Sequence, residues 1–115
     1  MKPEPIQELL ASLLRNGEQI FLLGVVLQEI LQGIRDPLRF KKIKNDLSLF
    51  PILELGRNEY EIAAELYNDC RSNGIQIGTI DALIAAASVM HECHLLTVDQ
   101  DFERIAPFCG LRLMS

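Results

Sequence analysis

Short apolar runs alternate with segments whose apolar residues recur at helical spacing, and this alternation constrains the fold more than any other feature. The runs fall at residues 20–23, 52–55, 95–98 and 111–114. Uninterrupted apolar runs of this length are typical of strands buried on both faces, as in a parallel sheet covered by helices. The sequence therefore predicts an α/β fold with a mainly parallel sheet and helices on both faces.

Capping signals place the helices between these runs. Helices are predicted over residues 6–14 and about 25–32. The next should begin at Asp36-Pro37 and end at Pro51, because Pro is favoured at the first helical position and excluded from the interior. Asn58 and Glu61 suggest a capping box for the fourth helix, which should end near residues 73–74. A short helical turn is predicted over residues 102–106, before a proline at 107.

Thr79 is a plausible N-cap for the apolar helix that runs to residue 90, which puts Asp81 in its first turn. On this helix, Asp81 lies on one stripe with Ala85 and Ser88. A second stripe is the predicted core face: Ile80, Leu83, Ile84 and Ala87. Small residues beside an acid leave room for either a ligand or a close helix contact.

Length and composition predict one globular domain over residues 1–115, with 49% hydrophobic residues and three widely spaced cysteines. No disulfide framework, apolar leader or membrane-spanning run is present in the sequence, so a cytoplasmic location is expected. The net charge of −5 counts somewhat against a nucleic-acid substrate. A local basic cluster could still contact phosphates or simply be a solvated helix face: Arg35, Arg39, Lys41, Lys42 and Lys44.

Four acidic residues are candidates for one metal site. Asp81 opens a helix, Asp99 and Asp101 follow the 95–98 run, and Glu29 lies inside an apolar helix. Ligands in α/β sheets bind outside the carboxyl ends of the strands, so these carboxylates can converge there on Mg²⁺ or Mn²⁺. Three of them also have a structural explanation: a helix-dipole contact for Asp81, an N-cap for Asp101 and a solvent-exposed position for Glu29.

Zinc is not favoured, because His91, Cys93 and His94 do not have the spacing of a closed tetrahedral site.

Three segments together resemble the successive motifs of the PIN domain, and most closely those of VapC-type toxins of bacterial toxin–antitoxin pairs. They are residues 26–33, 79–86 and 95–102. The resemblance implies a three-layer α/β/α fold and a Mg²⁺/Mn²⁺-dependent ribonuclease, usually a homodimer held inactive by a small antitoxin. It matches Glu29, Asp81 and Asp99 to the metal-site acids and Asp101 to an accessory acid.

If such a site works, Thr79 or Thr97 could orient a water or a phosphate oxygen. The chain departs from the family pattern at its start, because family members open with a central strand that ends in a metal-ligand aspartate. We therefore expect a fold that lacks this first strand and a low activity. The alternative is a non-catalytic PIN-like module that binds an antitoxin or dimerises without cleaving RNA. A third option is another metal-dependent phosphohydrolase on a similar scaffold.

Overall fold

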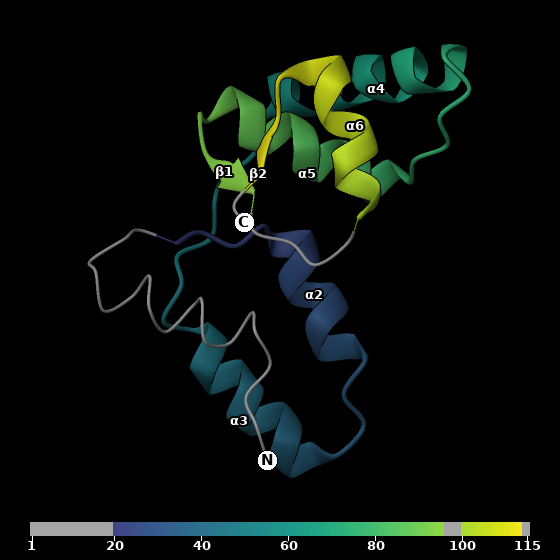
Figure 1. The fold of residues 1–115 in the computed structure, drawn as a ribbon. Helices are drawn as coiled ribbons and strands as arrows, with labels where there is room; N and C mark the ends of the chain where they lie inside the picture. The colour runs from purple at the N-terminus through teal and green to yellow at the C-terminus, as the bar shows by residue number, and fades with distance from the viewer. Residues whose placement is uncertain (1–19, 96–99, 114–115) are drawn as a thin grey trace. The chain divides into compact units, whose positions relative to one another are not determined.

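The computed structural model describes residues 20–95 and 100–113 (Figure 1). The chain divides into two compact units, residues 1–54 and 55–115. The predicted helix over residues 6–14 lies outside the described residues, as do Thr97 and Asp99. None of the described helices is long and apolar enough to cross a bilayer.

The first unit contains two neighbouring helices, α2 (Gly24–Gln32) and α3 (Pro37–Leu47) (Figure 1). The predicted start of α3 is confirmed, because Asp36 Oδ1 accepts a hydrogen bond of 3.2 Å from the Leu38 N–H. The predicted end at Pro51 is wrong, since α3 stops at Leu47. There Ser48 caps the helix, and its Oγ donates to a backbone carbonyl of the last turn at 2.6 Å.

The apolar runs at 20–23 and 52–55 pair in parallel, as predicted, but only through one bridge between Leu22 and Ile52. The Leu22 N–H donates to the Pro51 carbonyl at 2.9 Å, and the Leu53 N–H donates to the Leu22 carbonyl at 2.7 Å. The crossover between the two paired segments contains α2 and α3.

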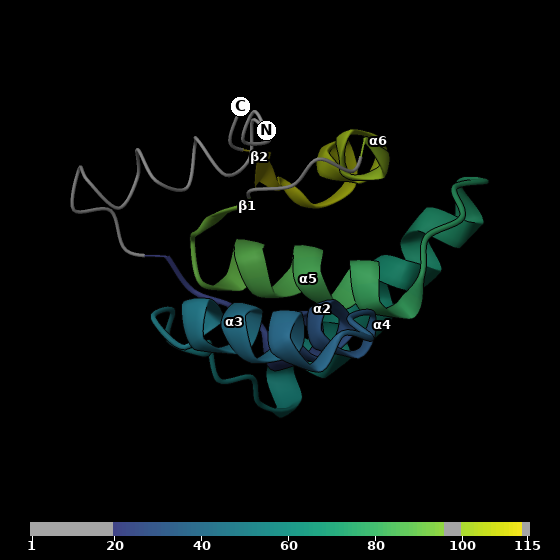
Figure 2. The same cartoon turned by 90° about the horizontal axis from the view of Figure 1, so that it is seen from below.

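The second unit contains α4 (Arg57–Ser72), α5 (Thr79–Met90), β1 (His94–Leu95), α6 (Asp101–Cys109) and β2 (Arg112–Leu113). The two strands are parallel, with His94 opposite Arg112 and Leu95 opposite Leu113. Helix α6 forms the crossover between them, and α5 packs against both α4 and α6 (Figure 2). The parallel pairing of the last two apolar runs is thus confirmed for the described residues.

The core of the second unit lies where α4, α5 and α6 meet. Its main cluster is Leu66, Cys70, Ala85, Phe102, Ile105 and Leu111. A second cluster joins Ala63 of α4 to Ala82 and Ala86 of α5. The predicted core face of α5 is confirmed in part, because Ala87 is buried and Leu83 and Ile84 pack against the two clusters. The other buried residues of α5 are alanines outside the predicted stripe, whereas Ile80, Leu83 and Ile84 are only half-buried. Small side chains allow the neighbouring helices to approach α5 closely.

Two helices begin at a different residue from the one predicted. The N-cap of α4 is Gly56, whose N–H donates to Glu59 Oε2 at 2.8 Å, so the predicted box of Asn58 and Glu61 is two residues too late. The N-cap of α5 is Gly78, which is extended, so Thr79 is the first helical residue rather than the cap.

Helix α6 is longer than predicted, because it continues through Pro107 to Cys109. A proline in this position removes one backbone hydrogen bond. Burial of Phe102 and Ile105 on the core holds the helix together despite that loss. The helix stops instead at Gly110, whose φ of +73° is the left-handed conformation that glycine adopts without strain.

Candidate functional site

Asp81 is the best-placed candidate acid in the described residues. It lies in the first turn of α5, as predicted, and its side chain is half-buried. The unpaired N–H groups and the dipole of a helix N-terminus favour a carboxylate there by about 0.3–1 kcal/mol. Its Oδ2 lies near Gly78, 3.8 Å from where a Cβ on that glycine would stand. The start of the helix thus presents a carboxylate in a partly desolvated position.

The stripe next to Asp81 is packed rather than open. Ala85, one turn further along α5, is fully buried in the main core cluster. Ser88 Oγ donates a hydrogen bond of 2.8 Å to the Ile84 carbonyl within the same helix. Of the two interpretations of these small residues, a ligand or a close helix contact, the structure favours the close helix contact.

Asp101 is the first residue of α6, not its N-cap, which is Gln100. Its Oδ1 accepts a hydrogen bond of 2.8 Å from Arg104 Nη2, and both side chains are more than half exposed. An exposed ion pair of this kind contributes little to stability, but it places a cation beside the carboxylate. Arg104 was not among the predicted site residues, although its i, i+3 spacing from Asp101 on a helix was a signal for it.

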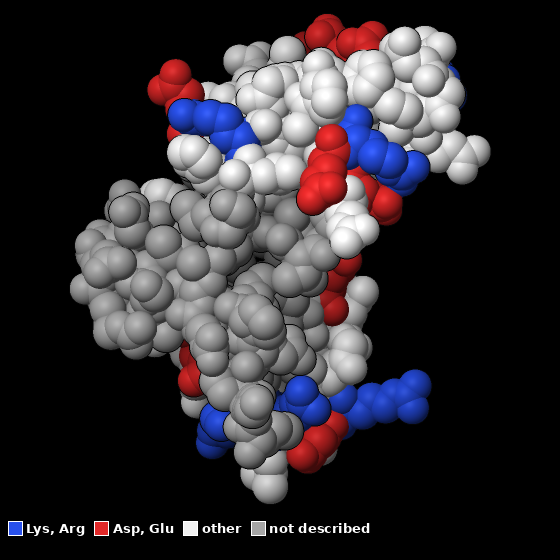
Figure 3. Space-filling view, in the orientation of Figure 1, with Lys and Arg blue, Asp and Glu red and all other residues white. Residues whose placement is uncertain are grey.

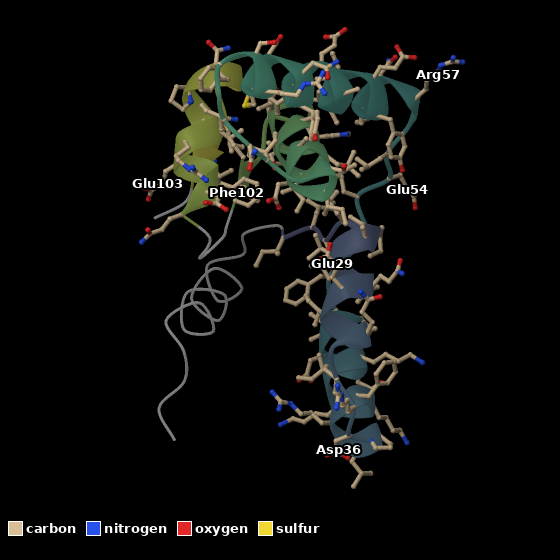
Figure 4. The ribbon with its side chains drawn as sticks, turned by 90° about the vertical axis from the view of Figure 1, so that its right-hand side faces the viewer. Glu29, Asp36, Glu54, Arg57, Phe102 and Glu103 are labelled. Atoms are coloured by element: carbon tan, nitrogen blue, oxygen red, sulfur yellow. The ribbon has the colours of Figure 1, made fainter. Side chains whose placement is uncertain are left out.

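Glu29, which Figure 4 labels on α2, is exposed in the first unit. This agrees with its structural explanation as a solvent-facing residue. Thr79 is exposed at the start of α5 and lines a groove of about 330 Å³ between α4 and α5. Tyr60, Tyr67 and Leu83 also line this groove, which is mostly apolar. Such walls suit an apolar ligand rather than a phosphate.

Within residues 20–95 and 100–113, no three His, Cys, Asp or Glu side chains are grouped so that they could hold a metal ion. The oxygen donors of Asp81 and Asp101 are of the kind that Mg²⁺ and Mn²⁺ prefer. Glu29 belongs to the other unit and Asp99 lies outside the described residues. The convergence of the four acids therefore stays a prediction.

Two of the side chains considered for zinc, His91 and Cys93, have other contacts. His91 Nε2 lies 3.0 Å from Glu59 Oε1, and Cys93 Sγ donates to the His91 carbonyl at 3.4 Å. Hydrogen bonds from the Gly56 N–H, from its own backbone N–H and from His91 lower the pKa of the Glu59 carboxyl. No local pattern signals the contact between Glu59 and His91, because the two residues are 32 positions apart.

The comparisons with known proteins decide the family. The PIN domain profile matches residues 1–107. The chain belongs to the PIN-domain family. Among curated PIN relatives, it is 39% identical over 105 residues to Ribonuclease VapC1 of Rickettsia felis, an alignment that covers 84% of this chain and 76% of the relative. It is also 30% identical over 99 residues to Ribonuclease VapC of Rickettsia bellii, covering 78% and 73% respectively.

A solved structure extends this agreement to the fold. The chain matches the crystal structure of VapBC2 from Rickettsia felis bound to a DNA fragment from its promoter, with a TM-score of 0.80 and 25% identity. The match covers 97% of this chain and 85% of that one. These similarities confirm the predicted VapC-type PIN membership and the PIN-like α/β fold.

Proposed function

We propose that this PIN-domain protein is a divalent-metal-dependent ribonuclease and the toxin of a toxin–antitoxin pair. The observation that carries the proposal is Asp81, a half-buried carboxylate in the first turn of α5, in a chain 39% identical to a VapC ribonuclease. Glu29, Asp99 and Asp101 are proposed as the other acids of the site.

The acids have the chemistry for such a site. Carboxylate oxygens are the ligands that Mg²⁺ and Mn²⁺ prefer, and the start of α5 fixes the backbone from which Asp81 projects. A bound ion would activate a water and neutralise the charge that develops on the scissile phosphate. The hydroxyl of either Thr79 or Thr97 is proposed to orient that water or a phosphate oxygen. Arg104, paired with Asp101, limits the repulsion between the acids and an incoming phosphate.

The partners are inferred from the relatives. The VapBC2 structure is that of a toxin–antitoxin pair bound to DNA, and we infer that a small antitoxin binds this chain too. We also infer a homodimer in the cytoplasm. Several apolar side chains of the first unit are exposed in the single chain, including Ile30 at 39% and Leu38 at 81%, and association would cover such residues.

The test compares wild type with Asp81→Asn and with the matched control Asp69→Asn, an exposed acid on α4. Mn²⁺ binding is measured by calorimetry and cleavage is measured on RNA and on small phosphoesters. Asp81→Asn should weaken Mn²⁺ binding and slow RNA cleavage by about tenfold or more, while Asp69→Asn should change neither.

Each result separates the alternatives. Cleavage unchanged in Asp81→Asn would refute the site. Cleavage of small phosphoesters but not RNA would indicate another phosphohydrolase. Antitoxin binding without cleavage would indicate a non-catalytic module.

A further inference from the structure

Helix α3 and the residue before its N-cap carry a dense group of positive charges. Within residues 35–44, five cationic side chains stand against one carboxylate, that of Asp36, which caps the helix. All five are exposed, and in the described part of the chain no ion pair joins any of them to an acid. We call this group the α3 basic face: Arg35, Arg39, Lys41, Lys42 and Lys44.

The helical positions place the four cations of α3 in two rows. Arg39 and Lys42 form one i, i+3 row, and Lys41 and Lys44 form a second. Ile43 follows Arg39 by four residues and Leu47 follows Lys44 by three, so these half-buried apolar residues lie between the two rows, and α3 packs against α2. The two rows therefore flank the half-buried Ile43 and Leu47, and the cations of both rows are exposed. Figure 3 shows Lys and Arg side chains in blue over α3.

The face contrasts with the rest of the chain. The whole chain has 11 Lys and Arg and 16 Asp and Glu residues. Outside residues 35–44, six of these basic residues and 15 of the acidic ones remain. An acidic protein repels polyanions at long range, so a polyanion that binds needs a local patch of opposite charge. A row of exposed Lys and Arg is the footprint expected for phosphodiester contacts.

We propose that the α3 basic face binds the phosphodiester backbone of the RNA substrate. This inference rests on the proposed ribonuclease function and names the surface that holds the substrate. The face has cations but few side chains that could recognise bases. Phe40, which is 36% exposed, is the one aromatic residue on α3. Phosphate contacts position a strand without specifying its sequence. The face therefore provides affinity for RNA rather than sequence preference.

The experiment measures binding of labelled single-stranded RNA in EDTA, so that cleavage plays no part. It is repeated over roughly 50–200 mM KCl. The variants are Arg39→Gln with Lys42→Gln, and Lys41→Gln with Lys44→Gln, one pair for each row. The matched control, Arg57→Gln with Arg71→Gln on α4, removes the same charge elsewhere. Circular dichroism of each variant checks folding.

Each α3 pair of substitutions should weaken RNA binding by about tenfold at low salt. It should also reduce the slope of log K against the logarithm of the salt concentration by about 1.4, because each phosphate that is no longer neutralised contributes about 0.7. The control should stay within about twofold of wild type. No RNA binding by wild type, or equal losses in the control and both α3 pairs, would overturn the proposal. The proposal would also be overturned if the α3 variants kept their affinity for RNA but no longer bound an acidic peptide. That result would assign the face to a protein partner. Failure of the ribonuclease proposal appears separately, as absent cleavage with RNA binding intact.

Discussion

His91 Nε2 lies 3.0 Å from Glu59 Oε1 and joins the end of α5 to the first turn of α4. The Glu59 side chain is 13% exposed and that of His91 is 33% exposed. The other oxygen of Glu59 accepts the Gly56 N–H at 2.8 Å, so one carboxylate both caps α4 and holds α5. Two helices distant in sequence are thereby coupled through a single side chain.

This shared role predicts non-additive mutations. Glu59→Ala should lower the unfolding temperature more than His91→Ala, because it removes the helix cap as well as the histidine contact. The double variant should be close to Glu59→Ala alone. Glu61→Ala, whose partner Arg57 is 90% exposed, is the control and should have a small effect. Thermal unfolding of the four variants tests this, and additive losses would show that the two residues act independently.

The pH dependence of stability should follow from the lowered pKa of Glu59. A carboxyl whose pKa is lower in the folded state stabilises the fold above its ordinary pKa, and that contribution is lost as the pH falls through the folded value. Wild type should therefore be more stable than Glu59→Gln at neutral pH, with the difference shrinking below pH 4.5, the ordinary value. Urea unfolding over this range measures the difference. An undiminished difference near about pH 3 would contradict the prediction.

Phe102 and Phe108 lie on the same helix in opposite environments, and Figure 4 labels the first of them. Phe102 is 3% exposed in the main core cluster, whereas Phe108 is 38% exposed. Phe102→Ala should lower the free energy of unfolding by about 3–5 kcal/mol through lost burial and the cavity left behind. Phe108→Ala is the matched control and should cost clearly less. Equal losses in denaturant unfolding would mean that α6 does not pack as described.

The alanine contact between α4 and α5 should not tolerate a larger side chain. Ala82 is 1% exposed and clusters with Ala63 of the facing helix. Ala82→Leu should therefore destabilise the fold by about 1–3 kcal/mol through overpacking. Ala64→Leu, at an exposed position of α4, should be nearly neutral. Denaturant unfolding checks both, and a neutral Ala82→Leu would show that the helices are less closely packed.

Glu92 has a φ of +53°, in the left-handed region that glycine adopts more easily. Its carbonyl accepts a hydrogen bond of 2.7 Å from Arg112 Nη2, a backbone contact that a glycine keeps. Glu92→Gly should raise the free energy of unfolding by roughly 0.5–1 kcal/mol. Glu65→Gly, inside α4, should lower it by about 1 kcal/mol. A destabilised Glu92→Gly variant in the same unfolding assay would contradict this interpretation of the turn.

The sequence alone determined the features that depend on local chemistry. Asp36-Pro37 set the start of α3, because a side-chain cap and a fixed φ act within one turn. The position of Asp81 in the first turn of α5 was likewise predictable, and so was the parallel pairing of the apolar runs. Motif order was enough to identify the family, since the PIN match covers residues 1–107.

Only the tertiary structure decided the features that depend on distant partners. Glu59, which caps α4 through a local contact with Gly56, is also held by His91, 32 positions away. Helix α6 passes through Pro107 because Phe102 and Ile105 are buried against other elements, which offsets a local penalty. The most buried residues of α5 are alanines, most of which lie in the clusters shared with α4 and α6, while Leu83 and Ile84 pack beside them half-buried. The periodicity of the sequence identifies the apolar residues of a helix, but tertiary packing determines which of them are buried.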